Sequence, residues 1–275
     1  MTRVMLTGHA GFIGRAILKR CQEEGFDTFL VEANIFESEI WDLELSQSLD
    51  NFHPDAVIHV GASSSTLEER VNFTFERNFM STSIISNWCL ENGSKLIYSS
   101  SAASYGQNGR FPSNLYGWSK YSAEKVVIAN KQVALRYFNV YGPGEDDKGK
   151  MSSVLLQGFI DQRNGSRPRL FPGNPRRDFV YIEDVVRANF YAIENYDSSK
   201  GNYFDVGSGE ARSFEEFLTL AKIDFDYHDA DRIPTGYQFF TVAEKSNFLP
   251  SWEPIFQIED GVASYLEYLS ERYEE

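Results

Sequence analysis

Short apolar runs recur through the first half of the chain, and each is bounded by polar or turn-forming residues. A run of this length that is flanked by turn residues is typical of a buried strand. Segments with helical spacing separate most of the runs. Strands that alternate with helices predict a parallel sheet with helices on both faces. The predicted strands lie at about 3–7, 28–32, 55–60, 94–99 and 133–138.

The pattern loosens after residue 142, where turn dipeptides separate shorter predicted helices at about 151–162, 213–222 and 255–270. We therefore expect an α/β protein with a Rossmann-like, doubly wound parallel sheet over residues 1–142. A segment near 175–208 is expected to return to this first domain. Most of 143–275 is expected to form a smaller C-terminal α/β lobe.

A glycine-rich turn follows the first predicted strand directly, with Gly8, Gly11 and Gly14 spaced three apart. A helix is expected to begin at about Phe12. Glycines let the backbone approach a pyrophosphate, and the helix N-terminus points its amides at the anion. This context predicts a dinucleotide site. The segment Gly61, Ala62, Ser63 follows another strand and is expected to lie along the dinucleotide, because loops at the carboxyl ends of parallel strands form the ligand crevice.

The second strand ends at Glu32, eighteen residues beyond Gly14. A carboxylate at this point can bind both ribose hydroxyls of NAD and repels a 2'-phosphate. No lysine or arginine occurs between Arg20 and Arg70. The sequence thus favours NAD as cofactor, with NADP as the second possibility. Asp42 has two interpretations, a contact with the adenine amino group or a helix cap.

Tyr116 and Lys120 lie four residues apart in a predicted helix, downstream of Ser101. Residues at this spacing share a helix face, so the ammonium can lie near the phenol. A nearby positive charge lowers the pKa of a tyrosine from about 10. The pair therefore predicts an acid/base group, and the Ser101 hydroxyl is expected to hold the oxygen whose proton is moved.

The chain of 275 residues carries a net charge of −14, which argues against a nucleic-acid surface. An anionic ligand must then be held by local cations. No apolar run approaches the roughly 20 residues of a membrane span. Cys21 and Cys89 fall in helical patterns and are expected to be buried thiols, which suits a cytoplasmic protein. The histidines lack metal-ligand spacing, so no metal site is expected.

Four motifs together resemble the extended short-chain dehydrogenase/reductase family, whose members act on nucleotide sugars. They are Thr7 through Gly14, residues 100–106, the Tyr116–Lys120 spacing, and Arg136 through Pro143. Further stretches are similar to ADP-L-glycero-D-manno-heptose 6-epimerases: 61–66, 136–151, 177–181 and 236–241. The resemblance implies a Rossmann fold, a substrate-binding C-terminal lobe, a nucleotide-diphosphate sugar as substrate and a homo-oligomer paired through helices. An outward part of the aromatic stripe on the predicted helix 72–91 could form the subunit interface.

The resemblance also implies roles for single residues. Tyr116 and Lys148 would be the two acid/base groups, one for each face of the reacting carbon. Lys120 would bind the nicotinamide ribose and Ser101 the reacting oxygen. Further cofactor contacts would be Phe12, Ile13 and Asn78. Substrate contacts would be Asn139, Lys148, Lys150, Gln157, Phe171, Gly173, Asn174, Arg177 and Tyr237.

Three departures from the heptose epimerase pattern stand out. Those enzymes usually bind NADP, and their basic residue after the acidic ribose contact is missing here. The segment between Ser101 and Tyr116 is shorter than usual. Lys150 and Gln157 stand where the family tends to carry serine and histidine. Taken without the family, Lys148 fits a charged loop and Arg176-Arg177 a solvated surface pair.

Three functions remain open from the sequence. The first is an epimerase that works by transient oxidation, most similar to the heptose 6-epimerases. The second is a UDP-sugar 4-epimerase, which needs no Lys148, or a dehydratase. Dehydratases usually carry an acidic pair just after Ser101, where this chain has Ala102-Ala103. The third is a non-catalytic NAD-binding regulator, against which the retention of Ser101, Tyr116 and Lys120 argues.

Overall fold

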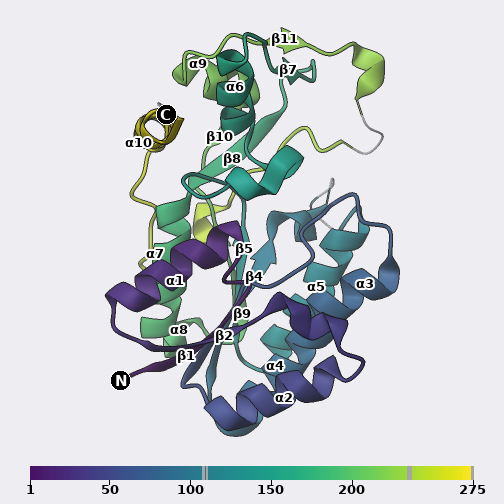
Figure 1. The fold of residues 1–275 in the computed structure, drawn as a ribbon, viewed down its shortest axis with the longest axis vertical. Helices are drawn as coiled ribbons and strands as arrows, with labels where there is room; N and C mark the ends of the chain where they lie inside the picture. Colours follow the sequence, from purple (N-terminus) through teal and green to yellow (C-terminus); the bar gives the residue numbers. More distant parts are fainter. Residues whose placement is uncertain (107–108, 110, 234–236, 274–275) are drawn as a thin grey trace.

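A computed structural model describes residues 1–106, 109, 111–233 and 237–273. Its centre is a parallel sheet of six strands in the order β2-β1-β3-β4-β5-β9 (Figure 1). The strands are β1 Arg3–Thr7, β2 Asp27–Val31, β3 Ala56–His59, β4 Lys95–Ser101, β5 Val133–Tyr137 and β9 Asn202–Val206. All five strands predicted for the first half are confirmed. The sixth, β9, lies within the segment near 175–208 that was expected to return to this domain, although no strand was predicted there.

Successive residues of β1 face opposite sides of the sheet. Val4 and Leu6 belong to one apolar core and Met5 to another. Helices α1 (Phe12–Glu23) and α7 (Ile182–Glu194) contribute to the first core. The second core is covered by α2 Trp41–Phe52, α4 Ser81–Asn92 and α5 Leu115–Ala129. Both faces of the sheet are therefore buried under helices, as the near-continuous apolar strands predicted, and the doubly wound Rossmann-like fold is confirmed (Figure 1).

The order of the strands determines where a ligand can enter. Strand β1 pairs with β2 on one side and with β3 on the other, so the chain reverses its direction across the sheet beside β1. Open parallel sheets bind ligands at such a switch point, outside the carboxyl ends of the strands. Thr7 and His59 are paired at the ends of β1 and β3. The glycine turn follows the first of these strands, and Gly61 lies just beyond the second.

The remaining elements of the second half lie above the carboxyl end of this sheet (Figure 1). A three-stranded sheet β10-β8-β6 and a pair β11-β7 carry most of them. Their core includes Tyr141, Phe179 and Phe217. The elements are β6 Asn139–Tyr141, α6 Val154–Arg163, β7 Arg169–Leu170, β8 Arg176–Tyr181, β10 Ala211–Ser213, α9 Phe214–Leu220, β11 Asp226–Tyr227 and α10 Ile258–Tyr273. The short helix α8 (Tyr196–Ser199) follows α7 and packs with the central sheet instead (Figure 1). Helices predicted at 151–162, 213–222 and 255–270 correspond to α6, α9 and α10.

The long helix predicted over 72–91 is interrupted by a π-helical turn. It consists of α3 (Val71–Phe75), η2 (Glu76–Met80) and α4. Such turns occur frequently at functional sites. Of the predicted aromatic stripe, Trp88 is buried in the core, whereas Phe73 is half-buried. Short 3-10 segments complete the chain: η1 Ala33–Glu37, η3 Ala102–Tyr105, η4 Asp146–Met151, η5 Ala230–Arg232 and η6 Lys245–Asn247.

Two further expectations from the sequence concern the environment of the protein. Cys21 and Cys89 are free, buried thiols in α1 and α4. Across the part of the chain that the structure describes, none of the helices has the length and apolar character that crossing a membrane requires.

Candidate active site

The glycine turn after β1 is shaped by close backbone contacts. A Cβ on Gly14 would lie 2.0 Å from the carbonyl oxygen of Gly8, and one on Gly8 would lie 2.6 Å from the amide nitrogen of Gly61. Gly8 also has a φ of +72°, which favours glycine. Gly11 precedes α1 and offers no side-chain cap, so the first amides of the helix are free to bind an anion. The residues present therefore fit a pyrophosphate at this turn.

The loop after β3 is held against the same turn. Thr7 Oγ1 accepts a hydrogen bond from the Gly61 amide at 2.9 Å. The Asn78 side chain, fully buried in the π-helical turn, accepts from the Ser63 amide at 2.7 Å and donates to Ser119 Oγ at 2.9 Å. Asn78 thus joins the predicted cofactor loop to α5. Ala62 lies between the two anchored residues, and its place beside a cofactor stays a prediction.

Glu32 follows β2 and its carboxylate is available for a ribose. Its side chain is 65% exposed, and Oε1 lies 3.3 Å from Nε2 of His9 in the glycine turn. Asp42 is exposed in the first turn of α2, whose N-cap is Ile40, so the helix-cap interpretation of Asp42 is wrong. A cation from a segment distant in the sequence, Arg77, lies near the segment that follows Glu32. Arg77 stacks on the ring of Phe36, in the segment that follows Glu32, at 4.9 Å.

Tyr116 and Lys120 lie on α5, one turn apart as predicted. The helix begins at Asn114, whose Oδ1 accepts from the Gly117 amide at 2.8 Å, and this cap fixes the first turn that carries Tyr116. Ser101 ends β4 and hydrogen-bonds to the Tyr116 side chain. Both residues line a cavity of about 250 Å³. Two residues that the sequence predicted to act together thus line the same cavity, and their catalytic roles stay predictions.

The expected lowering of the phenol pKa is wrong for this structure. Burial raises the pKa of Tyr116, although the hydrogen bond with Ser101 lowers it. Burial also lowers the pKa of Lys120 to about 7. The ammonium lies 4.4 Å from the ring centroid of Tyr98, a fully buried residue that the sequence analysis did not identify. Desolvation is the largest cause of both shifts, because burial disfavours the charged form of each group.

The cavity also collects residues from the second half of the chain. Asn139 and Arg177, both predicted, line it together with Ser101 and Tyr116. Residues that sequence reasoning missed are Thr66, Asn114, Gln238 and Thr241. The Thr241 hydroxyl is buried and has no hydrogen-bond partner among the described residues, so it can bond a polar ligand. Gln238 and Thr241 could have been found from the sequence, because both lie in the stretch 236–241 that resembles the heptose epimerases. Gly236, which opens that stretch, lies outside the described residues.

Arg177 is 8% exposed, so its interpretation as a solvated surface residue is wrong. Its guanidinium donates to the backbone oxygens of Arg176, at 2.9 Å, and of Gln238. The same group lies 5.3 Å from the ring centroid of Tyr237. Among the described cavity-lining residues, Arg177 is the cation. Guanidinium groups bind phosphates bidentately, which suits a diphosphate in an acidic protein.

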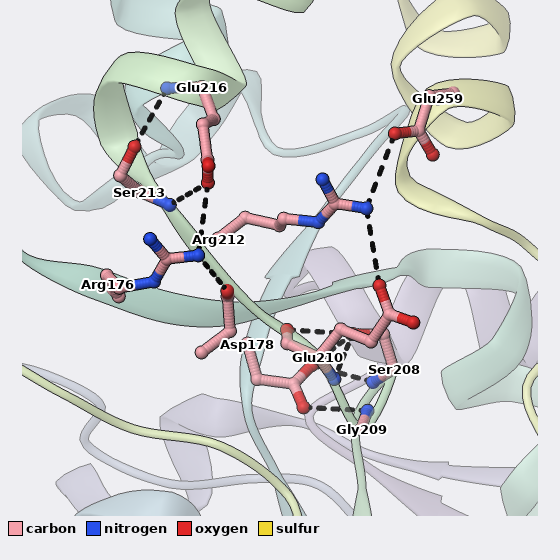
Figure 2. A network of polar contacts seen from close by, with 10 residues as sticks. Arg176, Asp178, Ser208, Gly209, Glu210, Arg212, Ser213, Glu216 and Glu259 are labelled. Carbon is pink, nitrogen blue, oxygen red and sulfur yellow. Dashed lines mark hydrogen bonds and ion pairs between the residues drawn. The ribbon is translucent and has the colours of Figure 1, made fainter.

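The strand that carries Arg177 is fixed from behind by a polar network, which Figure 2 shows. The buried Asp178 carboxylate accepts from the Ser208 amide at 2.6 Å and the Gly209 amide at 2.8 Å. Arg176 donates to Glu216, and Arg212 pairs with Glu210 and Glu259. Arg212 also stands opposite Arg177 in the register of β10 and β8. This network holds β8 in place and thereby fixes the backbone position of Arg177.

Lys148 lies apart from the Tyr116 cavity. Its ammonium is 5.1 Å from the ring centroid of Phe12, at the start of α1, and Lys148 does not line the cavity. Burial lowers the pKa of Lys148, while the neighbouring Glu145 carboxylate raises it. Its segment η4 is anchored to α1 by Arg15, which binds Asp147 at 2.6 Å. A solvated charged loop therefore does not describe this lysine.

The remaining predicted substrate residues lie in several separate places. Phe171 packs on Tyr237 with ring centroids 5.2 Å apart, and a Cβ on Gly173 would lie 3.0 Å from the Phe239 ring. Asn174 lines a separate open groove beside α9. Gln157 lies in α6 and donates to the Ser152 carbonyl at 2.7 Å. Lys150 belongs to η4, and its side chain lies outside what the structure describes. The predicted cofactor residue Ile13 is half-buried between the first core of the central sheet and the core that contains Tyr141 and Phe217.

A buried histidine lies below the cofactor loop. His59 Nδ1 is 2.6 Å from Thr7 Oγ1 and its Nε2 is 2.9 Å from Thr82 Oγ1. Burial and the neighbouring Lys120 charge lower the pKa of His59 to about 3. The imidazole is therefore neutral at physiological pH. Within the described ranges, no cluster of three or more histidine, cysteine, aspartate or glutamate side chains is suited to a metal ion.

The depressed pKa of His59 predicts acid destabilisation. In the unfolded chain histidine titrates near pH 6.5, so the stabilisation is present above that pH and is lost as the pH falls toward 3. Protonation of this histidine in the unfolded chain should lower the free energy of unfolding by about 2–3 kcal/mol between pH 7 and 4.5. Urea unfolding of His59→Gln at both pH values is expected to show a smaller loss than the wild type by that amount. Exposed His53→Asn is the control, and an equal acid loss in His59→Gln would contradict the assignment.

Comparisons with known proteins agree with this geometry. The family model of the NAD dependent epimerase/dehydratase family matches residues 4–207. ADP-L-glycero-D-manno-heptose-6-epimerase of Helicobacter pylori is 27% identical with a TM-score of 0.83, covering 98% of this chain and 96% of that one. UDP-glucose 4-epimerase of Thermotoga maritima, solved with UDP-glucose, is 23% identical with a TM-score of 0.86, covering 98% and 99%.

A third similar structure is dTDP-glucose 4,6-dehydratase of Bacillus anthracis in complex with NAD. It is 17% identical with a TM-score of 0.79 and covers 100% of this chain and 98% of that one. At such identities the last two structures show the shared fold alone. The family model spans the glycine turn, the predicted catalytic pair and all six strands of the central sheet. The chain belongs to the NAD-dependent epimerase/dehydratase family of extended short-chain dehydrogenases/reductases.

Proposed function

We propose that this protein is a nucleotide-sugar epimerase that works by transient oxidation, most similar to ADP-L-glycero-D-manno-heptose 6-epimerase. The observation that carries the proposal is the 250 Å³ cavity in which Tyr116, Ser101 and Arg177 converge. It joins a proton-transfer group to a cation for a diphosphate. The 27% identity over nearly the whole of both chains supports the heptose enzyme as the nearest function.

The side chains of this cavity have separate roles in the proposed reaction. Ser101 holds the sugar hydroxyl, and the Tyr116 phenolate accepts its proton, so that the resulting phenol can later return one. The Lys120 ammonium favours the ionised phenol and binds the nicotinamide ribose. Arg177 anchors the diphosphate, which positions the sugar for repeated proton transfer. Bound NAD supplies the chemistry that accepts a hydride from the sugar and returns it to the opposite face.

Lys148 is the proposed acid/base group for the second face of the reacting carbon. Its position beside Phe12 and its lowered pKa suit a lysine that releases a proton more readily than a solvated one. A Lys148→Ala variant is expected to lose inversion of ADP-heptose by about 10²-fold or more, because acid/base assistance has that size. The decisive measurement is kcat with ADP-heptose by NMR of the product. Lys19→Ala is the control, since Lys19 is 79% exposed on α1.

A second candidate function is a UDP-sugar 4-epimerase, which one specific observation favours. Lys148 does not line the cavity that contains Tyr116, and a 4-epimerase does not need this lysine. Inversion of UDP-glucose by the wild type, with Lys148→Ala equally active, would select this alternative. A dehydratase is not supported, because Ala102 and Ala103 line the cavity beside Ser101 where an acidic pair is needed.

We further propose that the protein is a cytoplasmic homo-oligomer. Large apolar side chains are exposed on neighbouring elements of one side of the Rossmann domain. Phe111 is 61% exposed and stacks on Trp118 of α5, while Val71 of α3 is 57% exposed. Exposed apolar side chains that cluster in this way are typical of subunit interfaces.

NAD is the expected resident cofactor, with NADP as the alternative that Arg77 leaves open.

A further inference from the structure

The predicted cofactor loop 61–63 is hydrogen-bonded to the rest of the protein at both of its ends. At one end the Gly61 amide donates to Thr7 Oγ1 at 2.9 Å, which holds Gly61 against the glycine turn. At the other end the Asn78 side chain accepts from the Ser63 amide at 2.7 Å and donates to the Ser63 carbonyl at 3.0 Å. The two anchors belong to different elements, because Thr7 ends β1 and Asn78 lies in the π-helical turn.

His59 connects these two anchors through the interior of the protein. Its Nδ1 lies 2.6 Å from Thr7 Oγ1, and its Nε2 lies 2.9 Å from Thr82 Oγ1. The Thr82 hydroxyl in turn donates to the backbone carbonyl of Asn78 at 2.6 Å. All four residues are buried, with exposed fractions of 5% or less. A hydrogen-bonded path therefore runs from one end of the loop to the other.

The directions of these hydrogen bonds follow from the groups along the path. A backbone carbonyl only accepts, so the single proton of the Thr82 hydroxyl goes to Asn78. Thr82 must then accept from His59 Nε2, which carries the ring proton. A neutral imidazole has one N–H, so Nδ1 accepts the proton of the Thr7 hydroxyl. Thr7 Oγ1 remains free to accept from the Gly61 amide, as the structure shows.

The surroundings of His59 keep the ring neutral. The ring centroids of His59 and Tyr98 of β4 are 5.8 Å apart, and the Lys120 ammonium lies 4.4 Å from the centroid of the same Tyr98 ring. Burial and this positive charge lower the pKa of His59 to about 3. The ring nitrogens and both threonine hydroxyls are thus paired in one arrangement, and a fully satisfied buried network has a fixed geometry.

We propose that His59 is a positioning residue for the dinucleotide, which in its Nε2–H tautomer ties Thr7 to Thr82 and so holds both ends of the loop 61–63 beside the glycine turn. Loss of one link leaves buried partners unpaired, so the loop shifts from the position that the dinucleotide needs. The consequence for NAD rests on the proposed function. The directions of the hydrogen bonds do not, because they are a property of the folded protein.

The first test is a long-range ¹H–¹⁵N NMR spectrum of the purified protein with ¹⁵N in its histidine rings. The chain has four histidines, and replacing His9, His53 and His228 by glutamine in turn identifies the His59 resonances as those that remain. A protonated Nε2 and an unprotonated Nδ1 are expected at neutral pH. The Nδ1–H tautomer, or a mixture of both tautomers, overturns the proposal.

The second test is a calorimetric titration of the apoprotein with NAD. Thr82→Val keeps the shape of the side chain and removes its hydroxyl, and the dissociation constant for NAD is expected to rise about tenfold, although Thr82 lies in α4 outside the loop. Thr82→Ser keeps the hydroxyl and is expected to bind NAD within about twofold of the wild type. If Thr82→Val unfolds at a lower temperature but binds NAD as tightly as the wild type, the network only stabilises the fold and the positioning role is overturned.

A second variant covers the case in which Thr82→Val does not fold. In His59→Gln the glutamine amide donates to Thr82 but does not replace the acceptor for Thr7, so the same rise of the dissociation constant is expected, and unchanged affinity there also overturns the proposal. Neither test uses a sugar. A wild type that binds NAD and inverts no sugar would therefore defeat the proposed epimerase alone.

Discussion

A Tyr116→Phe variant is expected to keep its bound NAD and to turn over its nucleotide sugar about 10²–10⁴-fold more slowly than the wild type. The phenol lines the cavity, and its hydroxyl hydrogen-bonds to Ser101, where the reacting oxygen is proposed to lie. Phenylalanine fills the same space, so the fold and the glycine turn should not change. The measurement is kcat by product analysis, with the dinucleotide content determined after denaturation.

The matched control for this variant lies on the same helix. Tyr121→Phe removes a hydroxyl from α5 at a half-buried position beside Trp118, outside the described cavity lining. Its turnover is expected to stay within about twofold of the wild type, because the Tyr121 hydroxyl does not line the cavity and its loss should change the stability of the protein by little. Near-normal turnover in Tyr116→Phe would refute the proton-transfer role.

A Gly14→Ala variant is expected to lose NAD. Its Cβ would lie 2.0 Å from the Gly8 carbonyl oxygen and 2.9 Å from the His9 Cα, and both are backbone atoms that cannot move independently. Overpacking of this kind costs about 1–3 kcal/mol, so affinity should fall about tenfold or more as the amides leave the pyrophosphate. Titration of the apoprotein with NAD measures the loss, and thermal unfolding reports the strain.

Gly25→Asn serves as the comparison for the glycine turn. Gly25 has a φ of +66°, which asparagine tolerates, and a Cβ there would meet no atom within 4 Å. Its affinity for NAD should equal that of the wild type. If Gly14→Ala also bound NAD normally, the glycine turn would not be the pyrophosphate site.

The sequence predicted those parts of the fold whose signals are local. Apolar runs located β1, β3, β4 and β5 because these strands are buried on both faces, and the half-exposed edge strand β2 still carries an apolar run. Glycine spacing located the turn because Gly8, Gly14 and Gly61 nearly touch. Strand β9 was missed, since Asn202–Val206 mixes polar and apolar residues and gains its place only by pairing with β5. The same limit applies to Arg77, which reaches the segment after Glu32 through the tertiary fold.

The site shows the same division between local and tertiary information. Helical spacing placed Tyr116 and Lys120 one turn apart on α5, but it could not predict the pKa values, because the burial of Tyr116 and Lys120 depends on the whole core. The buried network around His59 was likewise not recognised, since its partners lie on β1 and α4. Asp42 was misread as a possible cap because the sequence does not show that α2 begins at Trp41.

The most direct measurement of the proposed epimerisation uses nucleotide sugars with deuterium at the carbon to be inverted. The purified protein is incubated with ADP-heptose and UDP-glucose in turn, without added dinucleotide, and the products are examined by NMR. The account predicts an inverted product that retains the deuterium at the same carbon, because the hydride leaves and returns within one site. Deuterium exchanged with solvent, or no inversion of either sugar, would contradict it.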